Sequence, residues 1–370
     1  MNVKISYSSK ENGNDAIQDI KEQFTDIDPR MVVYFASSVF DQENLSQQMQ
    51  NAFNSATVFG CSTAGEIVSG KMLKRSIVAM AFNSDAIEDV KVEIVENIKE
   101  GNNVEAAFSA FGVYYGTSMA ELDFKKYVGI ILVDGLSGAE ERLMDRIGDL
   151  TNVTFVGGSA GDDLKFEKTF VFAGNKAYTN AALLALIKPR IGFDIIKSQS
   201  FCSTDKTFVA TKVNVIDREV IEFNNRPAPI VYAEAVGTSV DDAPNKFMSH
   251  PVGLMIEGEP YVRSPQQIKG ERMVFYCNVL EGMELSLLNS TDILKDTNKA
   301  IDDKKKELGN ISAIINFHCI LRTLELESKG MTEAYGELFA DIPTIGFSTY
   351  GEEYIGHINQ TSTMLVLYNA

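Results

Sequence analysis

The sequence contains few of the residues from which disulfide frameworks and metal centres are built. Its 370 residues include four cysteines, three histidines and no tryptophan. Cys61, Cys202, Cys277 and Cys319 are widely separated, without a Cys-x-x-Cys pair, and the histidines lack metal-type spacing. The spacing therefore predicts neither a zinc site nor a set of disulfides, and each cysteine is expected to be a buried thiol.

Positive charge and long hydrophobic runs are also scarce. Lys and Arg number 34 against 51 Asp and Glu, which gives a net charge of −17, and the basic residues form no patch. Nucleic acid and anionic membranes are therefore poor partners. The longest uninterrupted apolar run, Ala181 to Ile187, is too short to span a bilayer, and the first residues contain no apolar signal segment. We expect a cytoplasmic protein without membrane insertion.

Phosphate-binding glycine motifs are missing as well. No Gly-x-Gly-x-x-Gly follows an apolar strand, and no Walker-type Gly-Lys-Ser/Thr is present. Nucleotide cofactors are thus unsupported, and we expect no cofactor from the residues alone. With 45% hydrophobic and 23% charged residues, the composition is that of a globular chain long enough for two or three domains.

What the sequence does contain is a repeated motif. Residues 59–67 and 345–353 both read Gly-x-Ser-Thr-x-Gly-Glu after an apolar strand, and residues 156–162 carry a shortened version that ends on Asp. Glycine permits close backbone approach, and the hydroxyls can hold a turn. The simplest interpretation of the repeated motif is that three strands end in similar turns. The alternative is that the three motifs form a shared site or junction. The motif-turn residues in the first two copies are Gly60, Ser62, Thr63, Gly65, Glu66, Ser159, Gly161 and Asp162.

The three motifs lie in similar units of secondary structure. Apolar patterning predicts strands at 31–36, 57–61, 77–82 and 90–95 with a helix at 42–53 in the first unit. A helix at 102–119, capped by Asn102 or Asn103, precedes a second unit with strands at 127–133, 154–156, 168–172 and 181–187 and a helix at 139–150. A third, partial copy has helices at 291–308 and around 332–339 and strands at 311–317, 344–347 and 363–367. We therefore expect an α/β fold (mixed α+β) of repeated strand-helix-strand-strand units, with mixed sheets flanked by helices.

The pattern changes after residue 193. Long alternating segments such as 207–215 predict an antiparallel sheet, and the prolines and asparagines of 224–229 interrupt the periodicity. Beyond them we expect a short helix at 230–236 and strands at 251–255, 273–279 and 283–288. The sequence thus predicts two domains, 1–225 and 226–370.

Taken together, the motifs resemble those of the FIST sensory family, with its N-terminal and C-terminal domains side by side in a stand-alone chain. The resemblance covers roughly residues 30 to 370. The segments that carry it are 59–67 and 155–162 in the first half, followed by Arg226-Pro227-Ala228, Tyr232, 261–265, 319–322, Tyr350-Gly351-Glu352 and Asn359-Gln360-Thr361.

The resemblance implies a signal-transduction module that binds an amino acid or a related small polar ligand. Some members of the family resemble haem-based nitric oxide sensors, so haem is an alternative. Many are fused to output domains, and a stand-alone module is expected to signal through a separate protein. A homodimer is left open, and no enzymatic activity is expected.

Two arginines are the leading ligand candidates. Arg263 and Arg322 are each predicted at a strand end, and a guanidinium can bind a carboxylate through two parallel hydrogen bonds. Glu352 is then available for an ammonium group. The alternative is that the arginines pair with Glu352, Glu66 or Asp162 and only join the repeats. The full set of expected ligand-binding residues is Arg263, Cys319, Arg322, Tyr350, Glu352, Asn359 and Gln360.

Nucleophilic catalysis and haem ligation are the competing hypotheses. Cys61, Ser159 or Cys319 could serve a hydrolase or transferase, and residues 157–161 match Gly-x-Ser-x-Gly, the nucleophile elbow of α/β-hydrolases. That elbow must turn directly into a helix, whereas the residues after 161 predict another strand. His318 or His357 would be the axial ligand if haem were bound.

Overall fold

The chain divides into two compact units. A computed structural model describes residues 2–101 and 103–369. The first unit comprises residues 1–197, 298–356 and 362–370, and the second comprises residues 198–297 and 357–361. The expected boundary at 225/226 falls inside the second unit. The two compact units are therefore divided differently from the predicted domains 1–225 and 226–370, and those domains stay a prediction from the sequence.

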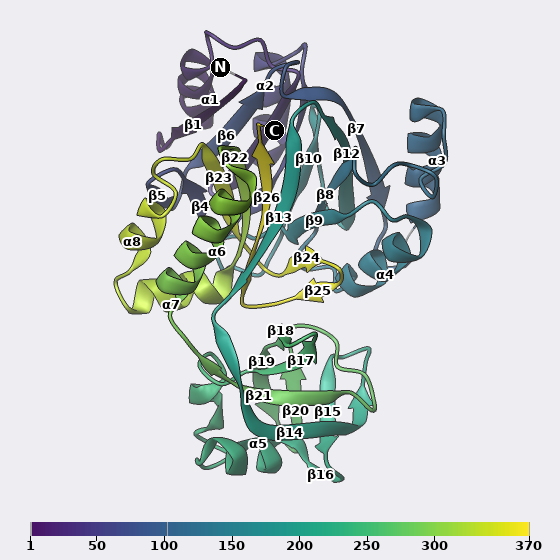
Figure 1. Ribbon diagram of the computed structural model, residues 1–370, viewed down its shortest axis with the longest axis vertical. Coiled ribbons are helices and arrows are strands. Elements are labelled where there is room, and N and C mark those ends of the chain that lie inside the picture. Colours follow the sequence, from purple (N-terminus) through teal and green to yellow (C-terminus); the bar gives the residue numbers. More distant parts are fainter. Residues whose placement is uncertain (1, 102, 370) are drawn as a thin grey trace. The chain divides into compact units, whose positions relative to one another are not determined.

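The first unit contains three copies of one strand-helix arrangement, as the repeated motif predicts (Figure 1). The first copy consists of β1 (Val3–Ser8), α1 (Gly13–Gln23), β2 (Met31–Ser37), α2 (Gln42–Ala52), β3 (Thr57–Thr63), β4 (Glu66–Val68), β5 (Lys71–Leu73) and β6 (Ile77–Phe82). The second copy consists of β7 (Ile87–Glu96), α3 (Val104–Tyr115), β8 (Val128–Val133), α4 (Glu140–Leu150), β9 (Phe155–Ser159), β10 (Val171–Ala173), β11 (Lys176–Tyr178) and β12 (Ala181–Pro189).

The third copy is interrupted by the second unit. It consists of β13 (Gly192–Gln199), α6 (Ile293–Leu308), β22 (Ile311–Cys319), α7 (Ile320–Ser328), α8 (Thr332–Glu337), β23 (Thr344–Thr349), β24 (Glu352–Tyr354), β25 (His357–Ile358) and β26 (Thr361–Tyr368). The third copy thus has the strands and helices of the other two, but the second unit is inserted into it after β13.

Each copy contributes the centre of one six-stranded sheet among the described residues. The first sheet has the order β1-β6-β2-β3-β10-β11, the second β7-β12-β8-β9-β24-β25 and the third β13-β26-β22-β23-β4-β5. In all three the central pair is parallel: β2 with β3, β8 with β9 and β22 with β23. The mixed α/β fold expected from the sequence is confirmed.

One hydrophobic core joins the three sheets. Strand residues alternate between two faces, so one face of each sheet packs into a common cluster that includes Phe35, Leu132 and Phe317. The opposite faces of the first and second sheets pack under α1 and α2 and under α3 and α4, respectively. The helices therefore cover the outside of the sheets, as Figure 1 shows.

The second unit is mainly antiparallel. Its strands lie in the order β18-β17-β21-β14-β15-β20-β19, and β16 pairs with β15. The elements are β14 (Phe201–Asn214), β15 (Glu219–Phe223), β16 (Arg226–Pro227), α5 (Ala228–Val236), a 3₁₀ helix (Ala243–Lys246), β17 (Val252–Ile256), β18 (Glu259–Arg263), β19 (Pro265–Lys269), β20 (Arg272–Phe275) and β21 (Glu284–Ser290). Its core, with Phe223 and Tyr232 fully buried, packs α5 against the sheet.

Several local expectations needed correction. Arg322 does not end a strand, because α7 begins at Ile320 and places it in the first helical turn. The buried face of α7 includes Arg322 and Glu325 beside Ile320 and Leu326, so the apolar period that would have predicted a helix is missing. Helix α1 was not predicted either. Asn103 caps α3 as expected, whereas Asn102 lies outside the described residues.

Glycine occupies one equivalent position in all three parallel pairs. A Cβ on Gly60, Gly157 or Gly346 would meet the backbone carbonyl oxygen of the neighbouring strand at 1.7, 1.7 and 2.3 Å, respectively. Each glycine pairs with the residue that owns this carbonyl. The repeated glycine is therefore required by strand spacing and not only by the turn that follows.

We expect Gly157→Ala to lower the free energy of unfolding by about 1–3 kcal/mol, because the added methyl group forces β8 and β9 apart. Gly148→Ala is the matched control in the same repeat. Gly148 lies within α4, and a Cβ there would meet nothing within 4 Å, so alanine should stabilise the chain by about 0.5–1 kcal/mol. Urea unfolding measures both changes. Equal effects of the two substitutions would contradict the steric argument.

Candidate functional site

The three motifs exchange strands in a cycle. Strand β4, which follows the first motif, pairs with β23 of the third copy. Strand β24, which follows the third motif, pairs with β9 of the second copy, and β10, after the second motif, pairs with β3 of the first. Each copy therefore completes the sheet of another copy. Of the two interpretations of the repeated motif, the structure favours a shared junction.

Backbone hydrogen bonds connect the motif turns directly. Ser348 donates its amide to the Gly65 carbonyl at 2.8 Å, and the Gly161 amide donates to the Ser62 carbonyl at 3.0 Å. The Tyr350 amide donates to the Ser159 carbonyl at 3.1 Å. The first motif thus contacts the third, the second contacts the first, and the third contacts the second. A displacement of one turn must disturb both others.

The acidic residues of the first and third motifs are held in the same way. Thr349 Oγ1 donates to Glu352 Oε1 at 2.6 Å, and Thr63 makes the equivalent bond to Glu66. Glu66 also accepts from the Ser76 hydroxyl at 2.6 Å and from its amide at 3.1 Å. Both carboxyl groups are buried. Burial raises the pKa of Glu66 to about 8, against the lowering effect of the Ser76 and Thr63 hydrogen bonds.

The second motif continues into a loop with an unusual backbone. Asp163, Leu164 and Phe166 have φ values of 56°, 64° and 56°, in the left-handed region that non-glycine residues rarely adopt. The Asp162 carboxylate accepts hydrogen bonds from the amides of residues 166, 167 and 168 and from the Tyr350 hydroxyl. These contacts hold the strained loop in place.

The charge state of this loop is set by the same contacts. Burial alone would raise the pKa of Asp162, but the Tyr350 and backbone hydrogen bonds outweigh it and hold the pKa below its ordinary value. The pKa of Tyr350 is raised, first by burial and then by its bond to Asp162. The Phe166 ring stacks on Tyr350 with centroids 5.1 Å apart. Tyr350 therefore joins the third copy to the second.

A buried polar network covers the outer face of β22. Asn316 and His318 lie two residues apart on this strand and therefore on the same face. The Tyr335 hydroxyl lies 2.9 Å from His318 Nδ1 and 3.3 Å from Ser362 Oγ. Ser362 donates to Asn316 Oδ1 at 2.7 Å. Burial, and then the charge of Arg322, lower the pKa of His318 well below its ordinary value, so the imidazole is neutral. This network is not among the features predicted above from the sequence. Two polar residues, two positions apart within an otherwise apolar strand, are the feature of the sequence that indicates it.

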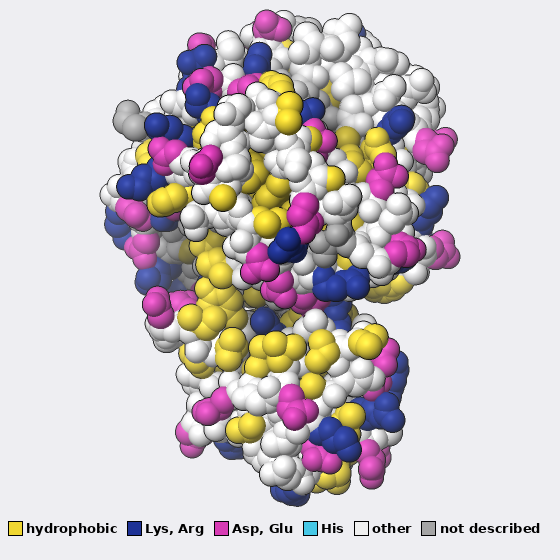
Figure 2. Space-filling view, turned by 90° about the vertical axis from the view of Figure 1, so that its right-hand side faces the viewer, with side chains coloured by type: hydrophobic (Ala, Val, Ile, Leu, Met, Phe, Trp, Pro, Cys, Tyr) yellow, Lys and Arg dark blue, Asp and Glu magenta, His cyan; other side chains and the backbone are white. Residues whose placement is uncertain are grey.

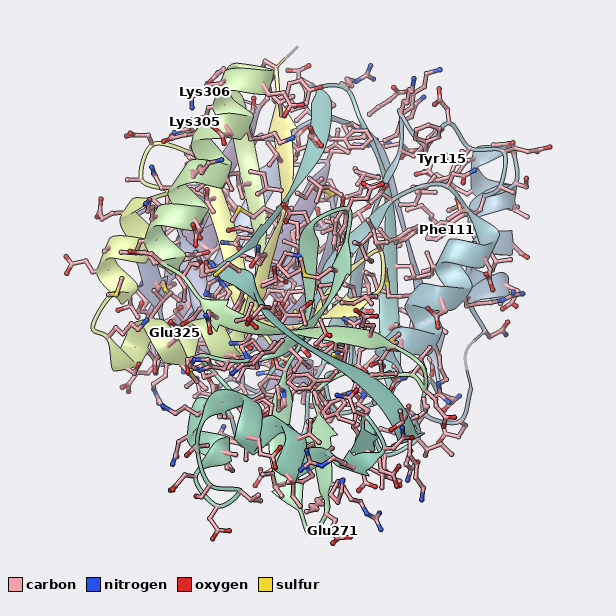
Figure 3. All side chains as sticks on the ribbon, turned by 60° about the horizontal axis from the view of Figure 1, so that its bottom comes forward. Phe111, Tyr115, Glu271, Lys305, Lys306 and Glu325 are labelled. Carbon is pink, nitrogen blue, oxygen red and sulfur yellow. The ribbon has the colours of Figure 1, made fainter. Side chains whose placement is uncertain are left out.

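Arg322 lies beside this network at the start of α7. Its exposed fraction is 1%, and it is the bulkiest of the fully buried side chains in the described chain. The neighbouring Thr323 hydroxyl lies 2.7 Å from Ser348 Oγ, which ties α7 to the third motif. Glu325, one turn later, accepts from Lys329 Nζ at 2.6 Å, and Figure 3 labels it on this helix. Cys319, Arg322 and Glu352 thus all belong to the carboxyl ends of the parallel pair β22 and β23 or to the turns that follow.

Three of the expected ligand residues lie in the second unit instead. Gln360 accepts from Ser264 Oγ at 2.7 Å and donates to the Met248 carbonyl at 2.9 Å. Arg263 Nη1 lies 3.4 Å from the His357 carbonyl oxygen. Asn359 is buried, and its Oδ1 has no hydrogen-bond partner among the described residues. Arg263, Asn359 and Gln360 therefore form a local cluster of that unit.

The nucleophile candidates have unfavourable surroundings. Ser159 Oγ lies 3.0 Å from Glu353 Oε1 and 3.3 Å from Glu140 Oε1, and the chain after it runs through the 162–168 loop to β10 and not into a helix. The elbow geometry is therefore missing at this serine. Burial raises the pKa of the Cys61 thiol well above its ordinary value, which disfavours the reactive thiolate.

Metal and haem binding find little support in the described residues. Among them, no group of three or more His, Cys, Asp or Glu side chains could hold a metal ion. Three surface pockets, lined by residues within 105–150, 11–45 and 14–52, contain no histidine side chain that could bind a haem iron. His318 Nε2 is buried without a hydrogen-bond partner in the described chain, but its ring packs against Tyr335 with centroids 4.6 Å apart. The surroundings of His318 therefore do not fit a haem.

We expect the free energy of unfolding to fall by on the order of 5 kcal/mol as the pH rises from about 4.5 to about 8, because the folded protein retains the Glu66 proton that the unfolded chain releases. Below about pH 4.5 Glu66 is protonated in both the folded and the unfolded state, and above about pH 8 it is ionised in both. Stability therefore depends on the ionisation of Glu66 only between these two pH values. Glu66→Gln should reduce the slope, as measured by urea unfolding at a series of pH values.

Glu43→Gln, at an exposed position in the first turn of α2, is the control and should leave the slope unchanged. If Glu66→Gln and the unmodified chain show the same pH dependence, Glu66 is ionised in the folded state and the argument from burial is wrong.

The comparisons with known proteins agree with this architecture. Residues 30–226 match the FIST N domain, and residues 228–354 match the FIST C domain. An uncharacterised protein of Methanocaldococcus jannaschii is 23% identical over 295 residues, which cover 74% of this chain and 57% of that protein. The chain therefore spans little more than half the length of this relative. None of the described helices has both the length and the apolar content to cross a membrane.

The two family matches together cover most of the chain and confirm the resemblance seen in its motifs. The protein belongs to the FIST family, whose domains are sensory domains of signal transduction.

Proposed function

We propose that this protein senses a small molecule with a carboxylate and an ammonium group, such as an amino acid, at the carboxyl ends of β22 and β23. The observation that carries the proposal is Arg322, a guanidinium with an exposed fraction of 1% in the turn that directly follows a parallel strand. In open α/β sheets, ligands commonly bind just beyond the carboxyl ends of parallel strands.

The chemistry of a buried arginine supports an anionic ligand. A carboxylate can accept two parallel hydrogen bonds from the guanidinium fork, which fixes the orientation of the ligand. Arg322 would therefore select the carboxylate end of the ligand.

The third motif offers the complementary charge. Glu352 is fully buried and accepts from Thr349 through Oε1, and a carboxylate is the natural partner of an ammonium group. Cys319 immediately precedes α7, and Tyr350 lies two residues before Glu352. In this proposal Cys319 and Tyr350 shape the site, while Arg263, Asn359 and Gln360 stay predicted ligand contacts of the second unit.

The junction suggests how binding would be transmitted. Ser348, next to Thr323 of α7, bonds the first motif, and Tyr350 bonds the second. A ligand held by α7 and Glu352 would stabilise one arrangement of the third motif and, through it, of both others. Such a shift requires that the ligand bind one arrangement better than the other. The output would pass to a separate signalling protein.

The test is a thermal-shift screen of amino acids and small carboxylates against the full chain and against Arg322→Lys and Arg322→Gln. At about 100 times its Kd, a ligand stabilises the folded state by about 2.7 kcal/mol. Lysine keeps the charge but loses the fork, so both variants should lose most of the stabilisation, and the loss should be greater with glutamine.

Arg30→Gln is the matched control, because Arg30 is an exposed arginine of the first unit that pairs with Asp89. It should leave the ligand shift unchanged. A ligand whose stabilisation survives both Arg322 variants in folded protein would contradict the proposed site, and so would a ligand that lacks any carboxylate but binds equally well.

A further inference from the structure

Helix α3 differs from its counterparts in the other two copies. It connects the first and second strands of its copy, as α1 and α6 do in theirs. The exposed positions of those two helices are polar or charged: Asn14, Asp15, Gln18, Lys21 and Glu22 on α1, and Lys295, Asn298, Lys299, Asp303, Lys306 and Glu307 on α6. The twelve residues of α3 include a single charged one, Glu105.

The apolar character of α3 extends to its outer face. Phe111 is fully buried and Tyr115 donates to the Leu186 carbonyl, and Figure 3 shows both on the side of α3 toward the sheet. On the outer side, Val113 has an exposed fraction of 86% and Tyr114 one of 50%. The other exposed positions of α3 are Glu105, Ala106 and Ser109. The outer face of α3 is therefore less polar than that of α1 or α6, which favours it as a contact surface.

An open groove runs along this face. It has a volume of about 610 Å³ and is lined mainly by apolar surface. Ser109 and Val113 line it from α3, and Gly116, Ser118 and Leu150 line it from outside this helix. Gly116 ends the helix with a φ of 71°, and a Cβ there would meet nothing within 4 Å, which leaves that end of the groove open. The groove suits small apolar side chains inserted from a second helix.

The edge of the groove is acidic. Glu105 lines it, and Glu121 accepts from the Thr117 and Ser118 hydroxyls on the opposite wall. Asp149 adjoins Leu150, and Arg146 pairs with Glu105 and Asp149. Two of these carboxylates, Glu105 and Asp149, share one guanidinium, and the whole chain has a net charge of −17. Figure 2, which faces this side of the molecule, shows hydrophobic side chains at the surface among acidic and basic ones.

We infer that the α3 groove binds an amphipathic helix of a separate signalling protein, with an apolar stripe against Val113 and with Lys or Arg beside the stripe. The twelve residues of α3 extend over roughly 18 Å, so about three turns of the partner would lie in the groove. The cations of the partner would face Glu105 and Glu121. This inference goes beyond ligand sensing and assigns the surface through which the signal leaves.

A second copy of this chain fits the groove less well. Packing α3 against α3 would bring the acidic edges of two copies together, and each copy carries the same large negative charge. Like charges in contact oppose association, whereas a basic helix removes this repulsion. The charge pattern therefore favours a different, positively charged partner.

The experiment uses the full chain and a synthetic helical peptide of about the length of α3, with Leu at i, i+3, i+4 and i+7 and Lys elsewhere. Fluorescence anisotropy should show micromolar binding that weakens as salt is added. Val113→Gln should weaken binding by about tenfold, because it removes the central apolar contact. Glu121→Gln should reduce both the affinity and its salt dependence.

Ile216→Gln is the control, because Ile216 is a similarly exposed apolar side chain, with an exposed fraction of 94%, but lies on the second unit and outside this groove. It should leave peptide binding unchanged. The inference is overturned if the Lys peptide does not bind, if a peptide with Glu in place of Lys binds equally, or if Ile216→Gln weakens binding as much as Val113→Gln. It is also overturned if the chain sediments as a dimer that Val113→Gln dissociates, since a second copy would then occupy the groove.

Discussion

The close approach of the three glycine-containing strand ends is the constraint on which the first unit depends. Each motif turn donates or accepts backbone hydrogen bonds with the others, and each turn continues into a strand that completes another copy's sheet. The parallel strands from which these turns leave lie so close together that Gly60, Gly157 and Gly346 have no space for a side chain. Without these contacts each sheet would lose two strands, and the common core would be open at that end.

This arrangement also explains why polar groups are buried at the junction. Where three turns meet, their amides and carbonyls need partners, and Ser62 Oγ donates to the Gly161 carbonyl and accepts from the Phe170 amide. The hydroxyls of Ser348 and Thr349 bond the buried side chains of Thr323 and Glu352. In the second motif Asp162 has this role, because its carboxylate accepts hydrogen bonds from three amides of the strained loop. Buried hydroxyls and carboxyls there are thus first of all structural, and a ligand would use a network that the fold already requires.

The third copy differs from the other two in a way that suits a sensor. It alone carries an inserted unit, and it alone buries an arginine in the first helical turn after its parallel strand. The first copy begins that helix with Gln42, and the arginine of the second copy, Arg142, is exposed. Gln42 donates to two carbonyls of its own turn, which closes that position in the first copy. The second copy differs elsewhere, in the apolar outer face of α3. One repeated framework therefore offers a distinct surface in each copy.

The sequence by itself determined the features that depend on neighbouring residues. Continuous apolar runs predicted β2, β8 and β12, the recurring glycine-serine motif predicted three similar units, and the motifs together predicted the FIST family. Only the tertiary structure decided which sheet each hairpin joins, because that choice depends on contacts between residues far apart in the chain. It also decided that residues 320–328 form a helix, since Arg322 and Glu325 on the buried face hide the apolar period, and that Arg263 lies in a different unit from Arg322. Burial of polar groups is a property of packing, and local sequence carries little signal of it.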